Sequence, residues 1–124
     1  MKIRENYTCP LEIVHDIMKG KWKTILLFQL SGGGRSLSQL EREINGISQK
    51  MLLQQLRELL EYGLVEKHAF PGYPLRVEYT LTAERGAKMM EAIRIMQEIG
   101  TGYLAERGAA GVPGPGEDTI PTEK

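Results

Sequence analysis

Apolar residues recur every three or four positions from Leu37 to Leu60, a spacing that predicts amphipathic helices. Asn45-Gly46 interrupts this pattern, because both residue types tolerate the left-handed backbone that ends a helix. The first helix is predicted to begin at Ser38, since Ser38-Gln39-Leu40-Glu41 has the form of a capping box. It would then extend for about two turns before the Asn-Gly pair.

A second helix is predicted to begin at Ser48, because serine caps helices by accepting a hydrogen bond from an amide of the first turn. Placing successive residues about 100° apart separates an apolar face from a polar one. The polar face carries basic and amide groups toward its N-terminus and the carboxylates of Glu58 and Glu61 toward its C-terminus. An anionic ligand would therefore meet the N-terminal half. The apolar face consists of Leu52, Leu53, Leu56, Leu59 and Leu60.

Two strands are predicted after Gly63, at residues 64–70 and 75–81, with a turn at Pro71-Gly72-Tyr73-Pro74. The second strand alternates, so that one face carries Leu75, Val77, Tyr79 and Leu81 and the other carries Arg76, Glu78 and Thr80. Two short helices followed by a hairpin is the order of a winged helix-turn-helix. In that module the second helix enters the major groove of DNA.

Further helices are predicted on both sides of this module, at residues 10–18, 21–30 and 83 to about 104. Pro10 suits the first position of its helix, and Thr82 is a suitable N-cap for the last one. The lone Trp22 is expected to pack in the core beneath the second helix of the module. The predicted fold class is α+β and mainly α, a winged helix-turn-helix with an N-terminal helix and a long C-terminal dimerisation helix.

The last helix is apolar over more than one stripe, which a single small domain cannot easily bury against itself. A second copy of the chain is the simplest cover, with the first helix joining the interface of a homodimer. Methionine also fills irregular space, so a pocket for a small-molecule inducer is the alternative. The predicted interface residues are Leu11, Val14, Met89, Met90, Ile93, Met96 and Tyr103.

Candidate contacts to double-stranded DNA lie on the polar face of the second helix, before the first helix and on the hairpin. Glutamine can pair with adenine, and lysine can donate to guanine or to phosphate. On an isolated helix the same residues would more often form a solvated face, but the neighbouring helix and hairpin favour DNA. A winged helix used only for protein binding is the alternative. The candidates are Arg35, Ser38, Ser48, Gln49, Lys50, Gln54, Arg57, Lys67 and Arg76.

The balance of charge argues against DNA binding, because 16 basic and 16 acidic residues cancel. The distribution weakens this objection. From Glu106 onward there are two basic and four acidic residues, so the preceding body of the chain has an excess of two positive charges. Within that body Lys19, Lys21 and Lys23 form a basic cluster, for which a solvated face is the ordinary explanation.

The length of 124 residues predicts one domain, at residues 1–107, and the Gly/Pro-rich segment 108–124 is predicted to be a flexible tail. We find neither a membrane span nor a signal-peptide core, so a cytoplasmic protein is predicted. The sequence also lacks metal-ligand spacing, a phosphate-binding loop and a paired nucleophile and base. An enzyme, a metal site and a cofactor are therefore not expected.

Four motifs in this order resemble the HxlR-type winged-helix transcriptional regulators: Cys9-Pro10, Gly20-Lys21-Trp22, Ile47-Ser48-Gln49-Lys50-Met51-Leu52 and Val77-Glu78-Tyr79-Thr80-Leu81-Thr82. The resemblance covers roughly residues 9–104. It implies a small bacterial or archaeal cytoplasmic regulator that binds a pseudo-palindromic operator as a homodimer, with the second helix and the wing in contact with DNA. Four motifs together are specific, where each alone would be weak.

The resemblance has departures as well. Ser36 and Leu37 stand where the family usually has a basic residue and a phenylalanine, which leaves Arg35 as the candidate for the missing phosphate contact. The family's Leu-Thr-x-x-Gly is stretched here to Leu81-Thr82-Ala83-Glu84-Arg85-Gly86, so the last helix is expected to start with an altered cap.

Cys9 is the only cysteine, which excludes an intrachain disulfide and suits a reducing compartment. Its position at the start of a helix favours the thiolate, because the helix dipole stabilises negative charge there. In the family that the chain resembles, a cysteine at this position is thought to sense quinones, aldehydes or oxidants. Cys9 is therefore a candidate redox sensor and an oxidant a candidate inducer. The alternative is a helix-start residue packed beneath the neighbouring subunit.

Overall fold

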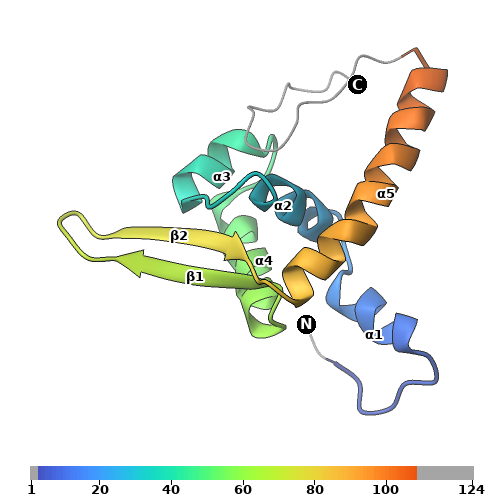
Figure 1. Ribbon diagram of the computed structural model, residues 1–124, viewed down its shortest axis with the longest axis horizontal. Coiled ribbons are helices and arrows are strands. Elements are labelled where there is room, and N and C mark those ends of the chain that lie inside the picture. The colour runs from blue at the N-terminus through green and yellow to red at the C-terminus, as the bar shows by residue number, and fades with distance from the viewer. Residues whose placement is uncertain (1–2, 109–124) are drawn as a thin grey trace.

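The computed structural model describes residues 3–108, which form five helices and one antiparallel hairpin (Figure 1). The predicted winged helix-turn-helix is confirmed, with a helix before it and a long helix after it. The segment predicted to be a flexible tail lies outside the described residues, apart from Gly108. The elements are α1 (Pro10–Ile17), α2 (Trp22–Leu30), α3 (Leu37–Glu43), α4 (Gln49–Glu61), β1 (Val65–Phe70), β2 (Arg76–Leu81) and α5 (Arg85–Glu106).

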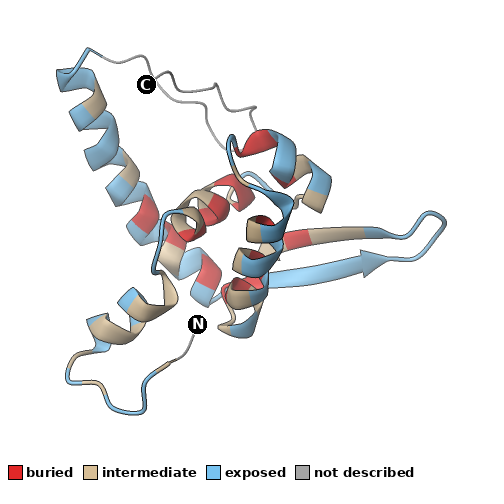
Figure 2. Cartoon of the chain, turned by 180° about the vertical axis from the view of Figure 1, so that it is seen from behind, coloured by how far each residue is buried: buried red, intermediate tan, exposed pale blue. Residues whose placement is uncertain are grey.

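The core lies where α2, α4, the base of the hairpin and the first half of α5 meet, as the buried residues in Figure 2 show. The predicted apolar face of α4 is confirmed at Leu52, Leu56 and Leu59, which are buried. Met90 and Ile93 were predicted at a dimer interface, but they are only 2% and 4% exposed within the single chain. They serve the core instead, because the first half of α5 packs on α2 and β2.

The cap of α3 differs from the prediction. Ser36, not Ser38, is the N-cap, and its Oγ accepts a hydrogen bond from the Gln39 amide at 3.3 Å. The Gln39 side chain closes the capping box by accepting from the Ser36 amide at 2.8 Å. The predicted capping box at Ser38 is therefore wrong, and Ser38 is an exposed residue in the first turn.

The hairpin is tied to the helices by a short third pairing. Val65 pairs with Leu81 at its base and Phe70 with Arg76 near its tip. Before α3, the amide of Arg35 donates to the Tyr79 carbonyl at 3.0 Å, and the Tyr79 amide donates back at 2.8 Å. This bridge holds the chain extended up to the residue that caps α3.

The start of α5 is packed closely against the hairpin. The Thr82 hydroxyl accepts from the Gly86 amide at 2.7 Å and donates to the Gly63 carbonyl at 2.7 Å. The predicted role of Thr82 as N-cap needs correction, because the N-cap position is Glu84, whose side chain makes no capping bond. Gly86 is buried, and a Cβ there would clash with the Leu64 carbonyl oxygen. Helix and strand can approach so closely only with glycine at this position.

Candidate nucleic-acid interface

The helix-turn-helix geometry depends on two local features between α3 and α4. Gly46 has φ +90°, a left-handed conformation that allows the chain to reverse after α3. Ser48 then caps α4, its Oγ accepting from the Met51 amide at 3.1 Å, as predicted. Together they place the first turn of α4 at the surface, with its amides directed outward and a partial positive charge at its end.

The outward face of α4 carries the predicted polar residues. Gln49, Lys50, Gln54 and Arg57 are all exposed, along the side opposite the buried leucines. Leu53, which was predicted in the apolar face, is 38% exposed and lies among them, so that prediction is wrong. The reason is its position at the edge of the leucine stripe.

Leu53 therefore belongs to the candidate interface, although sequence reasoning missed it. It lines one surface groove together with Lys50, Gln54 and Arg57, and the far end of this groove carries Glu58 and Glu61. An apolar side chain among polar readers can contact the methyl group of thymine. Its position at the margin of the apolar stripe was the sequence feature that could have predicted its exposure.

The inner side of α4 is fixed by a buried ion pair. Lys23 Nζ on α2 lies 2.6 Å from Glu58 Oε1, and the lysine side chain is 2% exposed. Burial raises the pKa of Glu58, the hydrogen bond and the charge of Lys23 lower it, and the pKa lies below its ordinary value. The expectation that Lys23 belongs to a solvated basic face is wrong. Its partner, Glu58, lies 35 residues further along the sequence, so no local sequence pattern predicts the pair.

Arg35 is also directed into the protein. Its Nε donates to Glu43 Oε1 at 3.0 Å, and one terminal nitrogen donates to the carbonyl oxygens of Gly33 and Gly34. The arginine side chain is 14% exposed and that of Glu43 is 4% exposed. This geometry argues against the predicted phosphate contact, because the guanidinium already holds the turn before α3.

The wing presents basic groups on both of its faces. Arg76 lies next to the tip, stacked over the Phe70 ring at 4.6 Å, and its Nε is 3.7 Å from Glu78 Oε2. Lys67 pairs with Tyr79, so its side chain belongs to the opposite face of the two-stranded sheet. Both side chains are exposed, on opposite faces of the wing.

His68 lies on the same face of the wing as Arg76. Its Nε2 is 3.0 Å from Thr80 Oγ1 and 3.2 Å from Glu66 Oε2. Within residues 3–108, no group of three or more His, Cys, Asp or Glu residues is arranged to hold a metal ion. The imidazole therefore belongs to a surface network of the wing.

Cys9 is the N-cap residue of α1 and is half-buried. The Glu12 carboxylate reaches back to this turn and accepts from the amides of Cys9 and Thr8 at 3.0 and 2.9 Å, and from the Thr8 hydroxyl at 2.6 Å. The bonds from the Thr8 hydroxyl and amide are the main causes that lower the pKa of Glu12. The thiol thus lies at a well-formed helix start that carries an ionised carboxylate.

The remaining predicted interface residues are exposed in part or in full. Helix α1 has no buried residue, and Leu11 is 76% exposed. On α5, Ile95, Met96, Ile99 and Tyr103 are between 56% and 66% exposed, beyond the part of the helix that packs on the core. These side chains form one uncovered apolar strip along the second half of α5, which we call the α5 strip.

The chain also matches a family model over residues 17–108, described as HxlR-like helix-turn-helix. The chain belongs to the HxlR-like helix-turn-helix family. Its relatives include the HTH-type transcriptional regulator YkvN of Bacillus subtilis, 37% identical, with 83% of this chain and 86% of YkvN covered. Another is an HTH-type transcriptional regulator of Methanothermobacter thermautotrophicus, 34% identical, with 90% and 84% covered.

Similar solved structures include those of two proteins, HypR and YodB. The redox regulator HypR in its reduced form is 36% identical, with a TM-score of 0.70 over 74% of this chain and 90% of HypR. The reduced form of the transcriptional regulator YodB from B. subtilis is 31% identical, with a TM-score of 0.66 over 74% and 90%. A structure of diamide-treated YodB is also similar, at 28% identity and a TM-score of 0.65 over 86% and 100%.

This HxlR-like chain is therefore a DNA-binding transcriptional regulator with a winged helix-turn-helix fold. Members of this family are regulators and not enzymes. None of its described helices is both long enough and apolar enough to cross a membrane. Helix α4 presents a serine-capped N-terminus followed by exposed polar side chains, the arrangement of a helix that enters the major groove in helix-turn-helix proteins.

Proposed function

We propose that this HxlR-like regulator binds a pseudo-palindromic DNA operator as a homodimer, with the outward face of α4 in the major groove. The observation that carries the proposal is the exposed set Gln49, Lys50, Gln54 and Arg57 behind the Ser48 cap. These residues supply donors for base edges and phosphates on one side of one helix. Arg76 and Lys67 are proposed to reach the DNA backbone from the wing.

The homodimer is supported by the α5 strip and by Leu11 on α1. Four large apolar side chains on consecutive turns of one helix are rarely left in water by a monomer. A twofold pair of copies would cover them and present two α4 helices to successive half-sites. Val14 and Met89, less exposed than Leu11, would border this interface.

DNA binding is tested by fluorescence anisotropy with the DNA upstream of the chain's own gene, across a series of salt concentrations. Lys50→Ala should weaken binding and reduce the salt slope by about one, since one phosphate or base contact is lost. Arg107→Ala is the matched control, because this exposed residue lies just beyond the end of α5, away from α4 and the wing (Figure 1). If both variants bind as wild type does, the proposed reading face is refuted and a protein-binding role gains support.

The dimer is tested by sedimentation equilibrium of the full chain. Ile99→Asp places a charge in the α5 strip without disturbing the core, so it should convert the dimer to monomers and weaken operator binding. Glu98→Gln on the same turn, exposed and polar, is the control. Wild-type protein that sediments as a monomer at micromolar concentration would overturn this part.

We further propose that Cys9 senses oxidants or electrophiles, which the similarity to HypR and YodB supports. With one cysteine per chain, oxidation by diamide would join two Cys9 thiols of different chains in a disulfide, while diamide is reduced to the hydrazine. Diamide should then release operator DNA from wild type and not from Cys9→Ser. Equal release from both proteins would remove the sensor role.

A further inference from the structure

An apolar cavity of about 570 Å³ lies between α1, the end of α4 and the first half of α5. Its size falls in the range of small-molecule sites. Its walls come from elements far apart in the sequence, which lie side by side in Figure 1. They are Ile3, Ile13, Val14, Ile17, Tyr62, Leu64, Arg85, Lys88, Met89 and Ala92.

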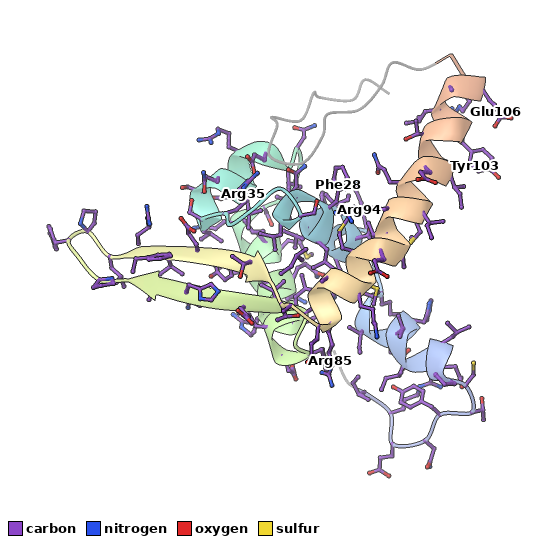
Figure 3. The ribbon with its side chains drawn as sticks, viewed as in Figure 1. Phe28, Arg35, Arg85, Arg94, Tyr103 and Glu106 are labelled. Atoms are coloured by element: carbon purple, nitrogen blue, oxygen red, sulfur yellow. The ribbon has the colours of Figure 1, made fainter. Side chains whose placement is uncertain are left out.

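Two cations accompany these apolar walls. Arg85 and Lys88 are both exposed side chains of the first turn of α5, and Arg85 projects from the helix start in Figure 3. One terminal nitrogen of Arg85 donates to the Tyr62 carbonyl at 3.0 Å, which fixes the guanidinium and leaves its other donors available. None of the residues that line the cavity is acidic.

Among residues 3–108, neither Arg85 nor Lys88 is in an ion pair. Glu84 and Glu91 line a neighbouring surface hollow together with these two cations. An apolar cavity beside two unpaired cations is complementary to a ligand with an apolar body and one anionic group.

We propose that this cavity binds a small apolar carboxylate as an effector. The carboxylate would accept from Arg85 and Lys88, and the apolar body would contact Met89, Ala92 and the isoleucines of α1. The effector role rests on the proposed DNA function. Tyr62 is the C-cap of α4 and Leu64 leads into β1, so an occupant contacts the end of the reading helix and the root of the wing.

A second copy of the chain is the competing occupant. The α5 strip begins one turn beyond Ala92, so a partner would pack next to the cavity. The first half of α5 faces α1 of the same chain, and the cavity is the space between these two helices. The cavity thus lies at the margin of the proposed interface, where an occupant would contact both the dimer helix and the DNA-reading module.

The test uses isothermal titration of the full chain, without DNA, with 1-naphthoate and with the neutral, similarly shaped 1-naphthalenemethanol. Naphthoate should bind once per chain, and Lys88→Gln should weaken it about tenfold, the value of one charge-assisted hydrogen bond. The same variant should leave naphthalenemethanol unchanged. Arg94→Gln, an exposed cation on the same helix outside the cavity, is the control.

Filling the cavity separates a specific site from surface binding. Ala92→Leu should abolish binding of both probes, with the far-UV circular dichroism of the variant unchanged. Absence of naphthoate binding in wild type, or binding that Lys88→Gln and Ala92→Leu do not alter, overturns the site.

The effector role needs a separate measurement. Saturating naphthoate should shift the operator affinity of wild type and not that of Ala92→Leu. Naphthoate that binds without changing operator affinity overturns the effector role. A chain that binds no operator refutes the proposed DNA function, while the titration without DNA still decides whether the site exists.

Discussion

Replacing Lys23 by methionine should destabilise the fold strongly, although lysine to methionine is usually a mild change. The Lys23 side chain is 2% exposed, and its amino group lies 2.6 Å from Glu58, whose side chain is 12% exposed. Methionine fills nearly the same volume, so packing is largely kept. The variant therefore isolates one effect, the loss of the positive charge beside a mostly buried carboxylate.

The expected cost follows from this burial. Removing one partner of a buried pair costs about 3–5 kcal/mol, because the other charge is left uncompensated. Glu58 is not fully enclosed, so the lower end, about 3 kcal/mol, applies. For a folded domain of this size that corresponds to a fall in Tm of about 12–24 °C. Replacing both residues by methionine should restore most of the stability, because the buried carboxylate is then removed together with its lysine.

The assay is urea unfolding followed by circular dichroism at fixed protein concentration, with Lys19→Met as the exposed control. In wild type the pKa of Glu58 lies below its ordinary 4.5, so its contribution is present above that value and is lost as pH falls below it. In Lys23→Met the carboxyl keeps its burial and loses the charge and hydrogen bond of Lys23, so its pKa should rise relative to wild type. The stability that Glu58 contributes above pH 4.5 should therefore be smaller in that variant than in wild type.

Three results would refute this reasoning. The first is a loss of less than about 1 kcal/mol in Lys23→Met, which would mean that the pair is screened like a surface salt bridge. The second is a double variant as unstable as the single one, which would mean that packing around Lys23 was the cause. The third is an equally strong pH dependence of stability in both proteins.

Gly86→Ala should cost about 1–3 kcal/mol in urea unfolding, because its Cβ would clash with the Leu64 carbonyl oxygen. Gly102→Ala in the same helix, with open space around it, should instead stabilise by up to about 1 kcal/mol, and equal effects would contradict the close packing. Ser36→Ala should lose about 1 kcal/mol as the true cap of α3, whereas a comparable loss in Ser38→Ala would favour the sequence-based cap.

The sequence predicts the order of elements because each carries its own local signal. Leucines at helical spacing identify α4, Asn45-Gly46 ends α3, and strict alternation identifies β2. The exposed polar face of α4 was predictable for the same reason, since it is the complement of the buried leucines. Such signals need only a few neighbouring residues to be read.

The predictions that were wrong depend on contacts that are distant along the chain. Serines at 36 and 38 both precede a Gln or Glu by three positions, so the local motif fits either. The choice falls on Ser36 because the Arg35–Tyr79 bridge ends there. Lys23 and Arg35 were taken for surface cations, and both are held by carboxylates that only the folded chain brings near.

These internal pairs also explain how a chain of zero formal net charge can present a DNA-binding surface. Lys23 with Glu58 and Arg35 with Glu43 remove charges of both signs from the surface without changing the total. The exposed charged side chains on the first three turns of α4 are those of Lys50 and Arg57, and the first exposed carboxylate of this helix is that of Glu61. Overall charge measures the average over all of these groups, whereas DNA meets only one face. The salt dependence of operator binding should therefore follow the few exposed cations of α4 and the wing, and it should be insensitive to the internal pairs.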